Sequence, residues 1–387
     1  MTGPEKPRRT TAQDVAAPKR TSGATAPAPP RRTAPEPARR TAAPEPALRA
    51  SAPRKTRATV HDVAAAAGVS RGTVNRVLNG GYVSTDARAA IEAAIAQVGY
   101  VPNRAASNLA RQRSQAVGFL ALEPHSLLLE DPNIGAIMLG ANAALSLADH
   151  QMVSLVIDSD RDTQRVGRYL SGGFVDGAII VSARSHDPIT RLIAEIGLPA
   201  TFVGHPPDLA RTIPFVGIDN VGSARAITGR LMQTGRQRIG MIAAALDRDS
   251  GADRLTGFKE ALGDRFDPQL VADVPLYDYA YGVKGMRALL DREPEIDGVF
   301  AASDAVAAGA LETLREAGRR VPEDVGLVGF DDSSWALRAQ PQLSTVHQPA
   351  REIGRTAAES VLQQIGGVEP VELSVLLDSP VVWRHSA

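Results

Sequence analysis

From residue 114 onward, short apolar runs alternate with stretches that have apolar residues at helical spacing. This alternation predicts parallel strands buried between helices, because each parallel strand is joined to the next by a crossover that is usually a helix. The region is too long for one small sheet, so we expect a two-lobed α/β body of doubly wound parallel sheets. The strand-like runs are AVGFLAL (116–122), MVSLVI (152–157), VDGAIIV (175–181), RIGMIA (238–243), DGVFA (297–301) and DVGLVGF (324–330), and the helical patterns cover 135–149, 187–196, 220–234, 254–262, 282–291 and 304–317.

Charge is unevenly distributed along a chain whose net charge is zero. Residues 1–50 hold ten Lys and Arg against four Asp and Glu, and residues 51–113 hold nine against three. The rest of the chain holds 24 against 36 and is acidic. A basic front joined to an acidic body predicts a polyanion as the partner of the front and a different partner for the rear.

Residues 1–57 have the composition of a disordered segment. They contain 11 of the 27 prolines and almost no large apolar side chains, so they cannot bury enough surface to offset the entropy of ordering. An imperfect repeat, RRTAPEPA followed by RRTAAPEPA, favours extended chain. Two interpretations remain open: a basic arm that adds non-specific attraction to DNA, or a solvated extension without a role in binding.

A compact bundle of three short helices is predicted over residues 58–101. Helical periodicity begins near the start of this range, and a glycine turn separates the first two helices, which is the pattern of a helix-turn-helix. Each helix has residues suited to begin or end it. The expected caps are Thr59 with Asp62 as a capping box, Ser70 and Ser84 at helix starts, and Gly68 and Gly99 at helix ends.

The second helix of this bundle predicts a surface that reads DNA. Its apolar residues Val74, Val77 and Leu78 face the bundle and leave the polar residues outside. Arg and Asn side chains match guanine and adenine edges in the major groove, and short polar side chains suit phosphate contacts. A generic bundle with a solvated polar face is the alternative. The outward positions are Arg71, Gly72, Thr73, Asn75 and Arg76, flanked by Ser70 and Asn79.

Several further motifs occur in a fixed order: TVHDVAAAAGVSRGTVNRVLN (59–79), GYVPNRAASNLA (99–110), VDGAIIV (175–181), RLTGF (254–258), ASDAVAAGAL (302–311) and VPEDVGLVGFDD (321–332). In these motifs the chain resembles the lactose-repressor/galactose-repressor family of bacterial transcription regulators, from residue 59 to about residue 384. The resemblance implies a helix-turn-helix domain, a hinge helix and a periplasmic-binding-protein-like body.

By this resemblance, residues 102–114 form the hinge helix and linker, and the effector-binding and dimerisation body covers 115–387. Leu109 matches the leucine that the family wedges into the minor groove, where apolar side chains kink DNA. The expected DNA-binding residues are Thr59, His61, Ser70, Arg71, Thr73, Asn75, Arg76, Asn79, Ser84, Tyr100, Asn103 and Leu109.

A small-molecule effector is expected beyond the carboxyl ends of the strands, where doubly wound sheets bind ligands. The resemblance implies contacts from Arg254, Tyr277, Ser303 and Asp331, whereas Gly204 stands where the family often has an effector-binding aspartate. An aspartate at a strand-to-helix turn is also a frequent N-cap, and that interpretation remains open for both aspartates of the set. The expected effector-binding residues are Glu123, His205, Arg254, Tyr277, Ser303, Asp304, Asp331 and Trp335.

Other classes of protein lack support in the sequence. The absence of cysteine excludes a disulfide scaffold, a thiolate metal site and a cysteine nucleophile. The phosphate-binding, nucleophile-elbow and zinc-protease motifs are absent, so neither an enzyme nor a metal or cofactor is expected. The chain has no apolar signal core and no run of about 18 apolar residues. It is therefore expected in the cytoplasm, associated with the nucleoid, unlike a periplasmic sugar-binding protein of the same body fold.

These features predict a sequence-specific DNA-binding transcriptional regulator. We expect a repressor whose affinity for double-stranded operator DNA is controlled by a small molecule, a sugar, bound between the lobes. One recognition helix reads too few bases for useful specificity, so a homodimer on a pseudo-palindrome is expected. An activator of the same fold, or a regulator that responds to a non-sugar ligand such as a nucleobase, is the alternative.

Deletion of residues 1–57 tests the basic arm. Each neutralised phosphate contributes about 0.9 to the slope of log affinity against log salt, so the deletion is expected to reduce that slope. Fluorescence anisotropy with labelled operator DNA across a salt series measures it. An unchanged slope would assign the segment to the second interpretation, a solvated extension.

Overall fold

The structure, a computed structural model, describes residues 58–101, 113–184, 186–205, 213–368 and 372–387. The predictions for the 1–57 segment and for the hinge helix, including Asn103 and Leu109, lie outside the described residues. The chain divides into two compact units, one that ends at Tyr100 and one that begins at Val101.

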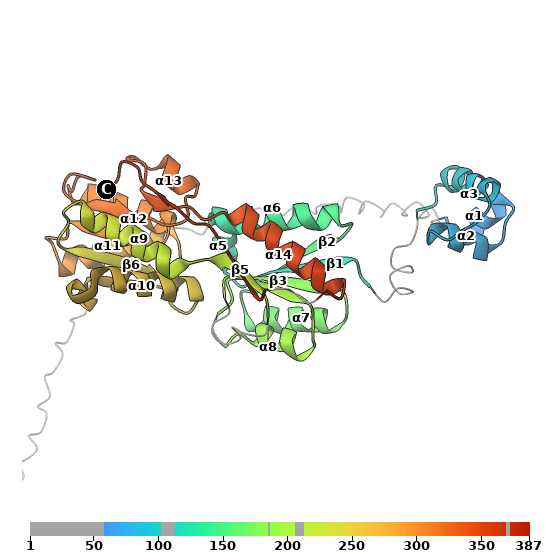
Figure 1. Cartoon of the computed structure of the whole chain (residues 1–387), viewed down its shortest axis with the longest axis horizontal. Helices are drawn as coiled ribbons and strands as arrows, with labels where there is room; N and C mark the ends of the chain where they lie inside the picture. Colours follow the sequence, from blue (N-terminus) through green and yellow to red (C-terminus); the bar gives the residue numbers. More distant parts are fainter. Residues whose placement is uncertain (1–57, 102–112, 185, 206–212, 369–371) are drawn as a thin grey trace, which may run out of the picture. The chain divides into compact units, whose positions relative to one another are not determined.

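The first unit is a bundle of three helices (Figure 1): α1 (Val60–Ala67), α2 (Arg71–Leu78) and α3 (Thr85–Val98). The helix starts follow the predicted chemistry, since the hydroxyl groups of Thr59, Ser70 and Ser84 each accept a backbone N–H of the first turn. Gly68 and Gly99 end α1 and α3 in the left-handed conformation that glycine adopts without steric cost. The small core consists of Val63, Ala64, Val74, Ile91, Ala94 and Tyr100.

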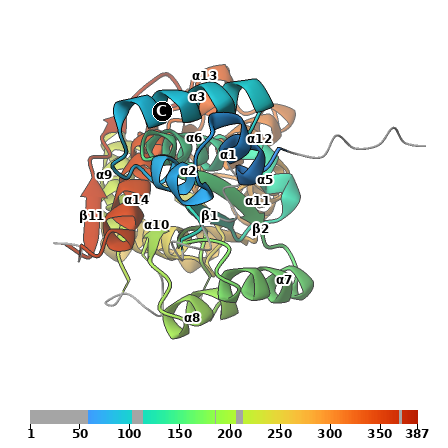
Figure 2. The ribbon, with the colours of Figure 1, turned by 90° about the vertical axis from the view of Figure 1, so that its right-hand side faces the viewer.

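The second unit begins with a six-stranded parallel sheet in the order β11-β5-β4-β3-β1-β2. Figures 1 and 2 show α6 and α14 on one face of this sheet and α7 and α8 on the other. Adjacent residues of β1 therefore face opposite helix layers, and Phe119 and Leu120 are both fully buried in different core clusters. The strands are β1 (Ala116–Ala121), β2 (Gln151–Val156), β3 (Gly177–Val181), β4 (Ala200–Val203), β5 (Phe215–Ile218) and β11 (Ser374–Leu377), and the helices are α5 (His125–Glu130), α6 (Pro132–Leu147), α7 (Asp160–Ser171), α8 (Pro188–Glu195) and α14 (Ala350–Ile365).

A second parallel sheet forms the other lobe, with four strands in the order β7-β6-β8-β9. The helices pack as two pairs, α9 with α10 and α11 with α12. Three crossings join the lobes: from β5 to α9, from β10 to α14, and from β11 to β12, which pairs with β10. The elements are α9 (Asn220–Gln233), β6 (Ile239–Ala244), α10 (Asp249–Leu262), η1 (Gly263–Arg265), η2 (Pro268–Leu270), β7 (Val271–Val274), α11 (Tyr279–Arg292), β8 (Gly298–Ala301), α12 (Asp304–Glu316), β9 (Gly326–Val328), α13 (Ser334–Arg338), β10 (Thr345–Val346) and β12 (Val381–Val382).

The predicted two-lobed α/β body with parallel sheets is confirmed. Each of the six apolar runs overlaps a strand, and each helical pattern overlaps a helix. The helical pattern predicted over 254–262 begins too late, because α10 begins at Asp249 and places Arg254 in its second turn. The patterns did not single out β4, β5 and β7, which have only four residues each, nor α7 and α14.

Two glycines allow the backbones of α6 and α14 to touch. A Cβ atom at Gly140 of α6 would overlap the carbonyl oxygen of Arg351, and one at Gly354 of α14 would overlap the carbonyl oxygen of Ile137. Both overlaps involve backbone atoms, which cannot rotate away as a side chain can. These positions therefore set the distance between the two helices.

Gly140→Ala is expected to lower the free energy of unfolding by about 1–3 kcal/mol, the usual cost of overpacking. Gly135→Ala is the matched control on the same helix, because a Cβ there meets no atom within 4 Å. Alanine should stabilise that position by about 0.5–1 kcal/mol through helix propensity. Urea denaturation of both variants measures the difference. Equal effects would contradict the close helix contact.

Candidate functional site

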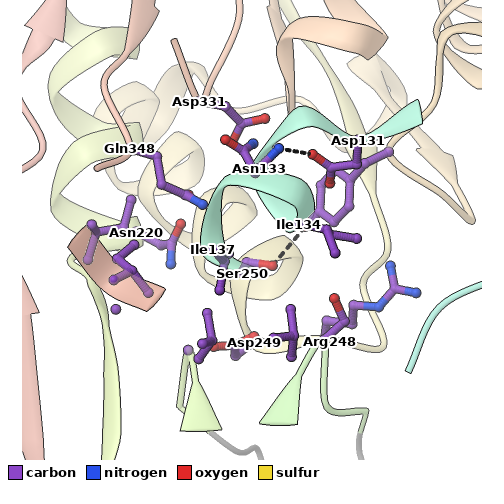
Figure 3. Close-up of a pocket in the computed structure, with 18 of the residues that line it drawn as sticks. Asp131, Asn133, Ile134, Ile137, Asn220, Arg248, Asp249, Ser250, Asp331 and Gln348 are labelled. Atoms are coloured by element: carbon purple, nitrogen blue, oxygen red, sulfur yellow. Dashed lines mark hydrogen bonds between the residues drawn. The ribbon is translucent and has the colours of Figure 1, made fainter. Parts of the chain in front are cut away.

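A cleft lies between the lobes of the second unit, at the carboxyl ends of strands from both sheets. Figure 3 shows its polar groups at two places, with Asp331, Gln348 and Asn133 at one end and Arg248 and Asp249 at the other. Ile134 and Ile137 lie between them. The lining residues are Glu123, Asp131, Asn133, Ile134, Ile137, Val181, Ser182, Val203, Gly204, Gly217, Ile218, Asn220, Arg248, Asp249, Ser250, Arg254, Tyr277, Asp331, Gln348 and Ile353.

Arg254 is the best-anchored side chain of the cleft, with only 4% of its surface exposed. Its Nε donates to the side-chain oxygen of Asn220 at 3.0 Å, its Nη1 to the carbonyl of Ala302 at 2.6 Å and its Nη2 to the side-chain oxygen of Gln348 at 3.2 Å. The guanidinium also lies over the ring of Phe330, 3.7 Å from its centroid. These contacts fix the plane of the guanidinium before any ligand binds.

Asp331 faces this guanidinium from the turn after β9, with its Oδ1 3.4 Å from Nη1 of Arg254. Burial raises the pKa of Asp331 well above its ordinary value, Arg254 opposes that shift, and Asp304 and Asp131 reinforce it. Its backbone has φ of +110°, a conformation that L-residues rarely adopt and that costs on the order of 1–3 kcal/mol. Backbone hydrogen bonds to Val346 and from Gln348 hold it there. Strain of this kind is common at ligand-binding positions.

At the other end of the cleft, Arg248 donates from Nη2 to Glu123 at 2.5 Å, and each side chain is only 2% exposed. Burial raises the pKa of Glu123 to about 7, although the positive charge of Arg248 opposes that shift. Glu123 follows β1 in the first lobe and Arg248 precedes α10 in the second, so this ion pair joins the two lobes.

Two further groups complete the lining. The hydroxyl of Tyr277 lies 3.0 Å from that of Ser250. Asp131 caps α6 by accepting the N–H of Asn133 at 2.8 Å, and burial raises its pKa. The cleft thus offers hydroxyl, amide, carboxyl and guanidinium groups next to isoleucine side chains, a combination suited to a ligand with many hydroxyl groups and small apolar faces.

The structure brings together four of the eight expected effector-binding residues: Glu123, Arg254, Tyr277 and Asp331. The other four do not line the cleft. His205 pairs with Asp253 at 2.9 Å, Ser303 is the N-cap of α12, Asp304 is fully buried, and Trp335 stacks on Tyr279.

Neither Asp304 nor Asp331 is the N-cap of a helix, and the two aspartates have different surroundings. Asp304 accepts hydrogen bonds from the Thr345 hydroxyl at 2.7 Å and from the Ser333 N–H at 2.7 Å, and so ties the turn after β9 to α12. Asp331 caps no helix, since Ser333 is the N-cap of α13.

Several residues of the cleft were not predicted from the sequence. Arg248 and Asp249 lie in a charged segment directly after strand β6, and that position was the available signal. Gln348 and Asn220 lie on the crossings between lobes, and neither has a local pattern that marks it. The missed polar residues are Asp131, Asn133, Ser182, Asn220, Arg248, Asp249, Ser250 and Gln348.

In the first unit, most of the polar side chains of α2 lie on the outside, as expected. Arg71, Asn75 and Arg76 are exposed on α2, and Val74 is buried. Thr73 is half-buried, and its hydroxyl lies 2.9 Å from that of Ser70. The other exposed positions of the expected DNA-binding set are Thr59, His61, Ser70, Asn79 and Ser84.

Tyr100 differs from the rest of this set. Only 8% of its surface is exposed, and its ring packs in the core of the bundle. Any contact that it makes with DNA therefore comes from the edge that remains accessible, and its main role in the described structure is to close the bundle.

The two units together define a class of protein: a helix-turn-helix module joined to a two-lobed body with a polar cleft between the lobes. The family model for bacterial regulatory proteins of the lacI family matches residues 59–103, and a periplasmic binding protein-like domain matches residues 228–387.

Individual relatives agree with this class. The chain is 42% identical over 340 residues to the HTH-type transcriptional regulator CelR of Thermobifida fusca. The aligned residues make up 86% of this chain and 99% of the relative. It is also similar to a solved complex of the transcriptional regulator CelR with cellobiose (39% identity, TM-score 0.69, 86% and 100% of the two chains). A lac repressor dimer bound to operator and an anti-inducer matches with 26% identity and a TM-score of 0.77, over 86% and 99% of the chains.

The chain belongs to the lacI family of bacterial transcription regulators, which confirms the resemblance found in the sequence. It is a DNA-binding regulator of the helix-turn-helix type. Among the described residues, no helix is long and apolar enough to span a membrane.

Asp304→Asn tests the structural role of this buried carboxyl group. Burial raises its pKa from the ordinary 3.8 to about 7, so the folded protein keeps a proton that the unfolded chain has already lost. Stability from this group is therefore present below about pH 4 and is lost as the pH rises to about 7. The amide cannot ionise and can still bond Thr345 and Ser333.

We expect the melting temperature of Asp304→Asn to depend less on pH between 4 and 8, and to exceed that of the wild type at pH 8 by about 2–4 °C per kcal/mol gained. The exposed Asp291→Asn is the control and should follow the wild-type profile. If the melting temperature of Asp304→Asn depended on pH as that of the wild type does, the effect assigned to ionisation of Asp304 would be contradicted.

Proposed function

We propose that this regulator is a repressor whose affinity for operator DNA is controlled by a neutral carbohydrate bound between the lobes, and that it leaves the carbohydrate chemically unchanged. The observation that carries the proposal is the pre-oriented Arg254, held by Asn220 and Gln348 and faced by Asp331. A fixed guanidinium beside a carboxyl group provides donors and an acceptor for neighbouring hydroxyl groups. The cellobiose complex of a relative with 39% identity supports a sugar as the ligand class.

On the DNA side, we propose that Arg71, Asn75 and Arg76 read bases in the major groove. They are exposed on one short helix, and their forked groups can form paired hydrogen bonds with base edges. One such helix per chain supports a homodimer on a two-fold symmetric operator, and a lac repressor dimer on operator is among the similar structures. The hinge proposed over 102–114 would complete the DNA contacts through Leu109.

The path from the cleft to the hinge runs through α14. Gln348, just before α14, bonds Arg254 in the cleft, and at the other end of α14 the carbonyl of Ile365 accepts a hydrogen bond from Arg113 at 2.9 Å. The carboxylate of Asp176 accepts the backbone N–H groups of Ser114 and Gln115, each at 2.7 Å. One rigid helix thus touches both the cleft and the start of the body. A ligand that changes the placement of α14 would move the point where the hinge joins.

Asp331→Ala tests the ligand side. It removes the carboxyl group that faces Arg254, so operator release by cellobiose should be lost while operator affinity without sugar stays within about twofold. A ligand can change DNA affinity only through its differential affinity for two states, usually worth about 1–3 kcal/mol. Fluorescence anisotropy with and without cellobiose measures both quantities. Asp291→Ala, at an exposed position of the same lobe, is the control, and a full response in Asp331→Ala would exclude the role proposed for Asp331.

Arg76→Ala tests the DNA side. Loss of a paired base contact should weaken operator binding by about 1–3 kcal/mol and relax one base position in each half-site. Selection of bound sequences from a random DNA pool measures both effects. A uniform loss across all sequences would instead make Arg76 a phosphate contact.

A further inference from the structure

The segment that leads into α10 carries polar atoms that the described residues leave unsatisfied. Nε and Nη1 of Arg248 and Oδ2 of Asp249 are buried and have no hydrogen-bond partner among those residues. Arg248 itself is 98% buried, since only 2% of its surface is exposed. Both side chains line the cleft. Buried polar groups are rarely left unpaired in proteins, and an unpaired one marks a place where a ligand can supply the partner.

The fold makes room for the Asp249 carboxylate. A Cβ atom at Gly204, just after β4, would overlap Oδ2 of Asp249. Any other residue at position 204 would therefore displace this carboxylate. Gly204 belongs to the first lobe and Asp249 to the second, so the carboxylate bridges the interface between the lobes at this end of the cleft.

We propose that Arg248 and Asp249 form a second polar subsite, opposite Arg254 and Asp331, which binds neighbouring hydroxyl groups of a neutral sugar. In this subsite Asp249 determines specificity: its free oxygen accepts a hydrogen bond from a sugar hydroxyl group, and the free N–H groups of Arg248 donate hydrogen bonds to sugar oxygens. The inference rests on the proposed function and extends it to a ligand that reaches both polar ends of the cleft.

Charge defines the ligand class further. Four carboxyl groups line the cleft, Glu123, Asp131, Asp249 and Asp331, against the two guanidinium groups of Arg248 and Arg254. Burial raises the pKa of Asp249 to about 6, with the nearby His205 opposing that shift, so near neutral pH its carboxylate is ionised and accepts hydrogen bonds. An anionic sugar would place its charge beside this carboxylate, while one arm of the Arg248 guanidinium already donates to Glu123. The subsite therefore selects neutral sugars over sugar phosphates.

The test measures binding of cellobiose, lactose, maltose, glucose and glucose 6-phosphate to the full chain by titration calorimetry. Asp249→Asn keeps the shape but loses the acceptor charge, and should weaken binding of the best neutral sugar about 10- to 100-fold. Asp247→Asn, two residues away and outside the cleft lining, should stay within about twofold. Asp249→Asn removes a buried charge, so its melting temperature should not fall.

A second pair of variants separates the carboxylate from general strain. Gly204→Ala and Gly197→Ala both place alanine at positive φ, +77° and +63°, but only the first meets Asp249. Gly204→Ala should therefore weaken binding of the neutral sugar at least about tenfold more than Gly197→Ala does.

The outcomes separate the two proposals. If the wild type binds a neutral sugar and Asp249→Asn binds it equally well, the subsite is wrong and the proposed function stands. If the wild type binds glucose 6-phosphate more tightly than every neutral sugar, the charge selection is wrong. If the wild type binds no neutral sugar of this set, the proposed function fails for these ligands and the subsite with it.

Discussion

The buried guanidinium of Arg254 is the interaction on which the cleft depends. It joins the start of α9 through Asn220, the end of β8 through the carbonyl of Ala302, and the crossing before α14 through Gln348. A charge this deeply buried is tolerable only when its donors are paired. Its removal would therefore release three segments at once, and the geometry of the ligand site follows from how these segments meet.

The cleft concentrates buried carboxyl groups around two guanidinium groups, and this has a cost. Burial raises the pKa of Glu123, Asp249 and Asp331, which means that each of them destabilises the fold when it ionises. Asp331 adds a backbone with φ of +110°. Strained backbone and raised carboxyl pKa values cluster at functional sites in proteins. In this chain, residues of both lobes contribute such features to the cleft. Among the residues that line the cleft, Glu123 and Arg248 form the ion pair that joins the two lobes.

Much of the architecture was predictable because it depends on local rules. The capping residues Thr59, Ser70 and Ser84 act as expected, since a hydroxyl before a helix satisfies a free N–H group wherever it occurs. The longer apolar runs became strands. Four-residue strands such as β4 and β5 carry too little periodicity to be recognised, and the polar helix α7 shows few apolar positions.

The sequence by itself determined the class of the protein, a helix-turn-helix module joined to an α/β body, because periodicity and helix caps are local features. It also marked the aspartate after β9 as a candidate site residue, through the motifs that occur in a fixed order along the chain. Only the tertiary structure decided which side chains share the cleft. Ser303 and Asp304 follow a strand as Asp331 does, yet they pack inward, whereas Arg248 and Asp249 reach the cleft across the lobes. Residues from different sheets come into contact only when both sheets have folded, so no local sequence pattern predicts which of them line the same cleft.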